Sequence, residues 1–210
     1  MPQLSCPEWT NDQEPFDKLD SIVKAAATIY EFILRQNLKK YLLNHGDLKT
    51  WHGKLFRDVV PVPYYAGNYR SADPRHPCLN VDNEVAGVPG APFQEVPKRM
   101  AQFSEKLESV TLDTGKSVAT PKSPELRLKA AAQLAAFAAG GIIQIHPFLN
   151  GNGRIARLTA NFFFNRYGFH MPFYVDRPSV GTEYATACNA AMVSGNFGPL
   201  FLYFISVLAR

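Results

Sequence analysis

Residues 146–157 read His-Pro-Phe-Leu-Asn-Gly-Asn-Gly-Arg-Ile-Ala-Arg and lie between two apolar segments of helical character. The first segment, residues 123–145, opens with serine, proline and glutamate, a strong helix start. It is expected to end near His146, because Pro147 disfavours helix in the residue before it. Its many alanines favour close approach by neighbouring helices, as in the centre of a bundle. A second helix is expected over residues 154–167.

The Gly-Asn-Gly turn at residues 151–153 is suited to holding an anion. Its glycines reach backbone angles closed to other residues and can turn several N–H groups toward one point. The helix that follows adds unpaired donors and the positive end of its dipole. Arg154 and Arg157 share one helix face, where both can meet phosphate oxygens. His146 stands at the other rim and can take a proton at neutral pH.

This segment resembles the signature of the Fic family, His-x-Phe-x-Asp/Glu-Gly-Asn-Gly-Arg-x-x-Arg, and departs from it only at Asn150. The resemblance runs loosely from Leu48 to the C-terminus and is sharp only at residues 146–157. It implies an all-α fold, a Fic-type bundle of six to eight helices with one small β-hairpin flap. It also implies a protein adenylyltransferase (AMPylation), which transfers AMP from ATP to a Ser, Thr or Tyr hydroxyl of a target protein and releases pyrophosphate.

The resemblance assigns a role to most residues of the segment. His146 is implied as the catalytic general base, and Phe148 as a structural anchor for the loop. The backbone N–H groups and the Asn152 amide are implied to hold the α- and β-phosphates, and the arginines to neutralise the β- and γ-phosphates. The residues implied to bind the nucleotide phosphates are Gly151, Asn152, Gly153, Arg154 and Arg157. On this basis we expect His146→Ala to abolish AMP transfer and to leave nucleotide affinity nearly unchanged.

Asn150 stands where the family has an acidic ligand for Mg²⁺. Its carbonyl oxygen can coordinate a hard cation, but it lacks the negative charge. Three interpretations of Asn150 remain open. The site binds Mg²⁺ more weakly with ATP as substrate, it uses another nucleotide or phosphate donor, or the protein is a non-catalytic nucleotide- or protein-binding module. We favour the first, because His146 and both arginines are present. It predicts that Asn150→Asp keeps or raises activity with Mg²⁺.

The residues before the long helix carry the other family features. Residues 79–93 have the turn residues of a short hairpin, and by resemblance this flap docks the target protein by backbone pairing. Arg70 is either an ordinary surface arginine or a support for the site or the flap. His52 lies beside apolar neighbours and is expected to be a hydrogen-bonded packing histidine.

The chain is expected to comprise an irregular tail, residues 1–16, and a single domain, residues 17–210. Helices are expected over residues 17–44, 48–56, 95–110, 180–193 and 199–208, with Asn44 ending the first and Asp47 capping the second. Residues 113–117 resemble a P-loop but lack its first glycine, so a loop is expected there. Thr10 and Glu14 have the spacing of the family's inhibitory motif, but Pro15 stands where that motif has Gly or Asn, so we interpret the match as a chance one in the tail. Restraint by a small antitoxin-like partner and the absence of any restraint are the two alternatives.

Composition limits the class of protein. The net charge of +4 is spread without a basic stripe, so no nucleic-acid partner is expected. Cys6, Cys78 and Cys188 show no metal or disulfide pattern, which fits a reducing cytoplasm. Residues 1–20 lack a signal-peptide pattern. The apolar run at residues 130–145 is too short for a bilayer span, so no membrane partner is expected.

Overall fold

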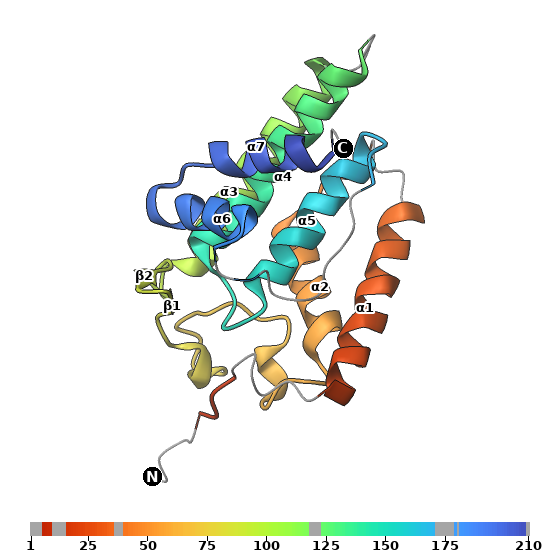
Figure 1. The fold of residues 1–210 in the computed structure, drawn as a ribbon. Coiled ribbons are helices and arrows are strands. Elements are labelled where there is room, and N and C mark those ends of the chain that lie inside the picture. Colours follow the sequence, from red (N-terminus) through yellow and green to blue (C-terminus); the bar gives the residue numbers. More distant parts are fainter. Residues whose placement is uncertain are drawn as a thin grey trace, which may run out of the picture.

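The structure is a computed structural model that describes residues 6–9, 16–35, 40–117, 123–170, 179 and 181–208. Within these ranges the chain forms seven α-helices, two short 3-10 helices and one antiparallel hairpin, which confirms the predicted all-α fold with a small flap (Figure 1). The elements are α1 Phe16–Arg35, α2 His45–Phe56, η2 Pro63–Tyr65, η3 Pro77–Leu79, β1 Glu84–Val85, β2 Val88–Pro89, α3 Val96–Ser117, α4 Pro124–Ile145, α5 Asn152–Arg166, α6 Glu183–Ser194 and α7 Gly198–Leu208.

Helix α4 is the centre of the bundle and packs against α3, α5, α6 and α7. Ser123 caps its start by accepting from the Glu125 N–H at 3.2 Å, as the sequence predicts. The small side chains along α4 let these neighbours approach its backbone. By length and composition α4 could cross a membrane, yet 72% of its apolar window is buried inside the fold. It is thus accommodated as a core helix.

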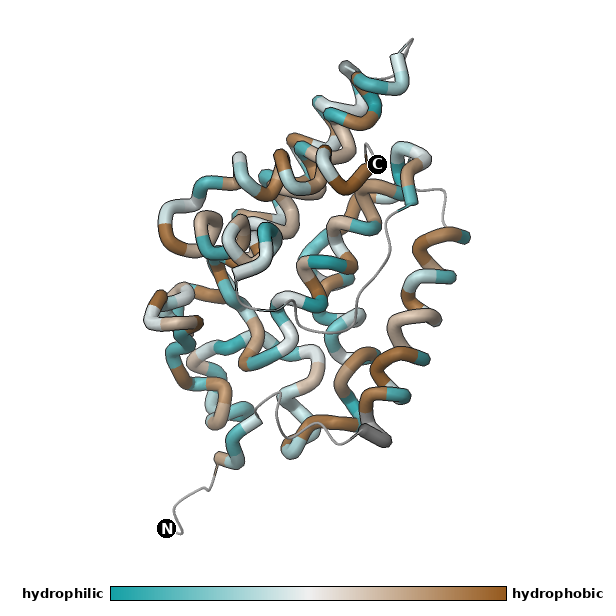
Figure 2. Tube along the Cα trace, in the orientation of Figure 1, coloured by the Kyte–Doolittle hydropathy of each residue, from teal (hydrophilic) through white to brown (hydrophobic). Residues whose placement is uncertain are grey.

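Helix α1 covers the opposite side of α5 and also packs on α2. Its buried residues recur at helical spacing, and Figure 2 shows apolar and polar residues alternating along the helix. The residues of this face are Ile22, Ala26, Ile29 and Ile33. Burying such a stripe stabilises an amphipathic helix mainly through tertiary packing.

Two local predictions are wrong. Asn44 begins α2 as its N-cap, because its Oδ1 accepts from the Gly46 N–H at 2.8 Å while the Asp47 Oδ2 accepts from the Asn44 N–H at 2.9 Å. This reciprocal pairing is a capping box. Residues 113–117 are the last turn of α3, in which Gly115 is half-buried and Lys116 forms an ion pair with Asp113. One glycine costs a helix only about 1 kcal/mol.

The expectation that no disulfide forms is also wrong, because Cys6 and Cys78 are bonded to each other, with their Cα atoms 5.3 Å apart. The two cysteines are 72 residues apart, so only the fold brings them together. The cysteine pattern therefore no longer supports a cytoplasmic location. Residues 6–9 have no helix or strand, but Trp9 is buried in the core. Thr10 and Glu14 lie outside the described residues.

Candidate functional site

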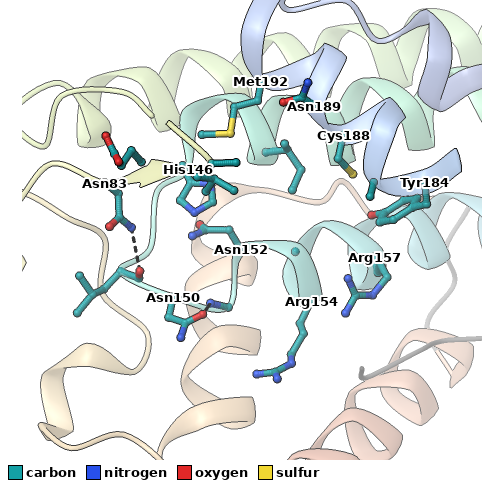
Figure 3. A pocket seen from close by; sticks show the side chains of 18 of the residues that line it. Asn83, His146, Asn150, Asn152, Arg154, Arg157, Tyr184, Cys188, Asn189 and Met192 are labelled. Atoms are coloured by element: carbon teal, nitrogen blue, oxygen red, sulfur yellow. Dashed lines mark hydrogen bonds between the residues drawn. The ribbon is translucent and has the colours of Figure 1, made fainter. Parts of the chain in front are cut away.

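A cavity of about 830 Å³ lies where the end of α4, the start of α5, the hairpin and α6 meet. Figure 3 shows the His146 ring near Asn152, with Arg154 and Arg157 projecting from α5 and Tyr184 and Cys188 from α6. The structure thus brings together the residues that the motif singles out. The motif residues that line the cavity are His146, Leu149, Asn150, Gly151, Asn152, Gly153, Arg154 and Arg157.

His146 is the C-cap of α4 and adopts a left-handed conformation, with φ 52°. Its amide N–H still donates to the Ile142 carbonyl at 2.9 Å, so the residue is fixed to the end of a rigid helix. Burial lowers the pKa of His146 to about 4, and the positive charge of Arg70 acts in the same direction. The imidazole is therefore neutral at pH 7 and can accept a proton.

Arg70 is fully buried behind His146 and donates hydrogen bonds to several backbone carbonyls. Its Nη2 lies 2.7 Å from the His146 oxygen and 2.9 Å from the Ala91 oxygen, and its Nη1 lies 3.1 Å from the Val81 oxygen. These bonds join the end of α4 to both ends of the hairpin segment. Burial lowers the pKa of Arg70 to about 10, so it remains charged at neutral pH.

The turn of residues 150–153 is closed by the side chain of Asn152. Its Oδ1 accepts from the Phe148 N–H and its Nδ2 donates to the Phe148 carbonyl, both at 2.9 Å. The Asn152 amide therefore shapes the loop, which differs from its expected direct contact with phosphate. Phe148 is fully buried and its ring stacks on His52 at 3.8 Å.

The first turn of α5 faces the cavity without a side-chain cap. Its N-cap, Gly151, has φ 80°, and a Cβ there would lie 2.4 Å from Cε2 of Phe56. Only glycine fits this position. An uncapped helix start offers backbone N–H groups and the positive dipole end to an anion.

His52 supports the loop from behind. Its Nδ1 accepts from the Gly67 N–H at 2.9 Å, so its Nε2 carries the proton and donates to the Asn150 carbonyl at 3.0 Å. Burial lowers the pKa of His52 to about 3, which keeps the ring neutral. The predicted packing role is confirmed, and the two hydrogen bonds show what the residue holds in place.

Arg154 and Arg157 give the cavity its positive charge. The Arg154 guanidinium lies 5.4 Å from the centre of the Phe56 ring. Arg157 is only 7% exposed, and burial lowers its pKa, with the Arg154 charge acting in the same direction. Two neighbouring cations in a partly buried cavity favour an anionic ligand, which relieves their repulsion.

The Asn150 side chain does not fit the role of a metal ligand. Its Oδ1 accepts from the Gly151 N–H at 2.6 Å and its Nδ2 donates to the Trp9 carbonyl at 3.1 Å. Both polar ends of the amide are thus used within the protein. No group of three His, Cys, Asp or Glu that could hold a metal is found among the residues that the structure describes.

Two further hydrogen bonds hold the hairpin next to His146. Asn83 donates from Nδ2 to the Leu149 carbonyl at 2.8 Å, and the Ala91 N–H donates to the Ile145 carbonyl at 3.1 Å. A Cβ on Gly90 would lie 2.8 Å from the His146 Cβ, so this close approach requires glycine. Glu84, Val85 and Ala86 consequently line the cavity.

Several lining residues are missed by sequence reasoning. Trp9 belongs to the expected tail, and Asn83 carries no motif. Helix α6 adds Tyr184, Cys188, Asn189 and Met192. No periodicity points to these residues, since their place depends on how α6 packs on α4. Burial raises the pKa of Cys188 to about 11, so its thiol is protonated at neutral pH and is a poor nucleophile.

The fold and site define a helical bundle in which the motif loop, between α4 and α5, faces a cavity lined by two arginines. Residues 42–164, more than half of the chain, match the Fic/DOC family, so the protein belongs to this family. A comparison with curated proteins gives no match.

Solved structures of Fic domains share the fold. A Fic-domain signalling protein from Bacteroides thetaiotaomicron matches with a TM-score of 0.63 and 22% identity, over 90% of this chain and 68% of that one. The BepC effector of Bartonella tribocorum, with bound AMPPNP, gives 0.60 and 21% over 91% and 84%. An N-terminal Fic domain from Bartonella quintana, with bound ADP, gives 0.63 and 18% over 91% and 82%.

Proposed function

We propose that the protein is an adenylyltransferase that moves the AMP portion of ATP to a hydroxyl of a target protein. The observation that carries the proposal is the geometry of the cavity: His146 stands at one rim, and the uncapped start of α5 lies between it and the two arginines. A polyphosphate suits this arrangement, with its reactive phosphorus near the histidine. Nucleotides bound to two structures of similar fold support a nucleotide as the ligand.

In the proposed reaction the target hydroxyl attacks the α-phosphorus. An oxygen–phosphorus bond forms, the bond to the bridging oxygen breaks, and pyrophosphate leaves. The hydroxyl proton passes to the neutral His146 imidazole. The pKa of about 4 describes the cavity without ligand, and bound phosphates raise it, because a nearby negative charge favours the imidazolium. Arg154 and Arg157 neutralise the charge that develops on the leaving group.

We propose that the target segment binds along the hairpin. The hairpin pairs Glu84 with Pro89 and Val85 with Val88, and no further strand pairs with either of them among the residues that the structure describes. An extended segment that pairs with such an edge is held mainly by its backbone, so many sequences can be accepted. Asn83 and Gly90 hold this edge beside His146, within reach of a hydroxyl.

The Asn150 amide is engaged by the Gly151 N–H and the Trp9 carbonyl, so no step of this scheme runs through Mg²⁺ at the position expected for it. The phosphates are held in the scheme by the α5 N-terminus and the arginines alone.

The reaction is tested by incubating the purified protein and a cell lysate with ATP labelled at either the α- or the γ-phosphate. The proposal expects label on protein from the α position only. Label from the γ position only would instead make the protein a phosphotransferase with the same base and anion site. ATP binding without label from either position would favour a non-catalytic nucleotide-binding module.

A further inference from the structure

The described N-terminal segment, residues 6–9, is attached to the domain at both of its ends. At one end Cys6 is bonded to Cys78 in η3. Beside this bond the Pro7 carbonyl accepts from the Tyr65 hydroxyl at 2.9 Å. Figure 1 shows this segment beside the turns that precede β1, where η2 and η3 lie.

At the other end Trp9 reaches the candidate site. Its side chain is 6% exposed, and its ring centre lies 5.2 Å from that of Phe56 and 5.9 Å from that of His52. It lines the cavity, and its carbonyl accepts from Nδ2 of Asn150 at 3.1 Å. Four residues therefore connect a covalent cross-link to the anion-binding loop.

Asn150 is the point where this connection meets the loop. Its Oδ1 accepts from the Gly151 N–H, and its own carbonyl accepts from His52. The contact with Trp9 needs a donor, which an amide has and an ionised carboxylate lacks. The asparagine that departs from the family signature is thus the residue type that can make this contact.

We propose that residues 6–9 form a disulfide-locked clasp that holds the phosphate-binding loop through Asn150, so that reduction of the Cys6–Cys78 bond weakens nucleotide binding. Asn150 is then a positioning residue. The inference rests on the proposed function only in taking the loop to be the nucleotide site.

Reduction of the Cys6–Cys78 disulfide needs a reductant, for which a dithiol is suited. One thiolate of the dithiol attacks the exposed Cys6 sulfur, the bond to Cys78 breaks, and Cys78 leaves as a thiolate that takes up a proton. The second thiol of the reductant then attacks the mixed disulfide and releases Cys6. Two electrons and two protons pass to the cysteines, and the dithiol becomes a disulfide.

After reduction the contacts of Pro7 and Trp9 are those that remain between residues 6–9 and the rest of the described chain. Losing the cross-link gives it conformational freedom that opposes the ordered contact with Asn150. We expect affinity for a non-hydrolysable ATP analogue to fall roughly 3- to 10-fold, the equivalent of one hydrogen bond.

The test uses the full chain, oxidised and after dithiothreitol treatment. Calorimetry measures affinity for the ATP analogue, and mass spectrometry measures amide exchange in peptides covering residues 148–154 without nucleotide. Reduction should weaken binding and speed exchange. Cys6→Ser should have the affinity and the exchange rate of the reduced protein, and dithiothreitol should not change either of them. Its effect and that of Asn150→Ala should be clearly non-additive, because both act through one contact.

The outcomes separate the clasp from the proposed function. The clasp would be overturned if reduction left amide exchange in residues 148–154 unchanged, or if the effects of Cys6→Ser and Asn150→Ala on affinity were additive. It would also be overturned if dithiothreitol weakened nucleotide binding in Cys6→Ser as much as in the parent protein. Faster exchange on reduction, in a protein that binds no nucleotide in either form, would support the clasp and overturn the proposed function.

Discussion

Arg70 donates two hydrogen bonds to the backbone carbonyl of His146, from Nε at 3.0 Å and from Nη2 at 2.7 Å. The same guanidinium reaches Val81 and Ala91 at the two ends of the hairpin segment. One buried, planar group thereby fixes the candidate base relative to the surface proposed to bind the target. An ammonium group has no comparable fork of donors.

We expect Arg70→Lys to lower the free energy of unfolding by about 2 kcal/mol, because it leaves buried carbonyls without a donor while keeping the charge. Urea denaturation measures the change. Lys98→Gln, on an exposed position of α3, is the control and should stay within about 0.5 kcal/mol of the parent. An unchanged midpoint in Arg70→Lys would show that the fork is not needed.

Stability should fall as the pH is lowered from about 6.5 toward 4. Burial lowers the pKa of His146 to about 4 and that of His52 to about 3, whereas unfolded histidines titrate near 6.5. The unfolded state therefore takes up protons first. The stabilisation is complete above about pH 6.5 and is lost on acidification, at about 1.4 kcal/mol per pH unit for each histidine.

Urea denaturation between about pH 7 and pH 5 measures this slope. His52→Phe removes one of the two histidines while keeping a ring that can stack on Phe148, so it should remove about half of the slope. Equal slopes in the parent and the variant would contradict the lowered pKa of His52.

Arg154→Gln and Arg157→Gln should each weaken ATP binding by roughly 10- to 100-fold, because each removes a charge-assisted contact to phosphate. Calorimetry at fixed salt measures the loss. Lys98→Gln makes the same change in net charge away from the cavity and should leave affinity nearly unchanged. A loss of equal size in Lys98→Gln would point to general charge rather than the site.

Asn150→Asp separates the two roles considered for this residue. The sequence alone predicts that it keeps or raises activity with Mg²⁺, since it restores the usual acidic ligand. The contact with Trp9 predicts the opposite, because a carboxylate cannot donate to that carbonyl. We expect roughly 3- to 10-fold weaker ATP binding with Mg²⁺ present. A gain in Mg²⁺-dependent transfer would restore the metal-ligand interpretation.

Much of the site could be predicted from sequence because its parts are local. The loop lies within twelve residues, its glycines satisfy a backbone requirement, and the arginines share a face of the helix that follows. The start of α4 could also be predicted, because Ser123 caps the helix that directly follows it. Such signals do not depend on the rest of the fold.

The remaining features depend on contacts between distant segments. Cys6 and Cys78 are 72 residues apart, and Trp9 meets Asn150 across most of the chain. The side chain of Asn152 has two equally reasonable uses, and only the position of Phe148 decides between them. Helix α6 joins the site through its packing on α4, which no motif records.

The most direct test compares AMP transfer and ATP affinity in the parent protein and His146→Asn. Asparagine suits this position because it tolerates the left-handed backbone, with φ 52°, better than alanine does. The account predicts that transfer is abolished while ATP affinity stays within roughly twofold, since the histidine takes the proton and the loop holds the phosphates. Transfer that persists in His146→Asn would contradict the central claim.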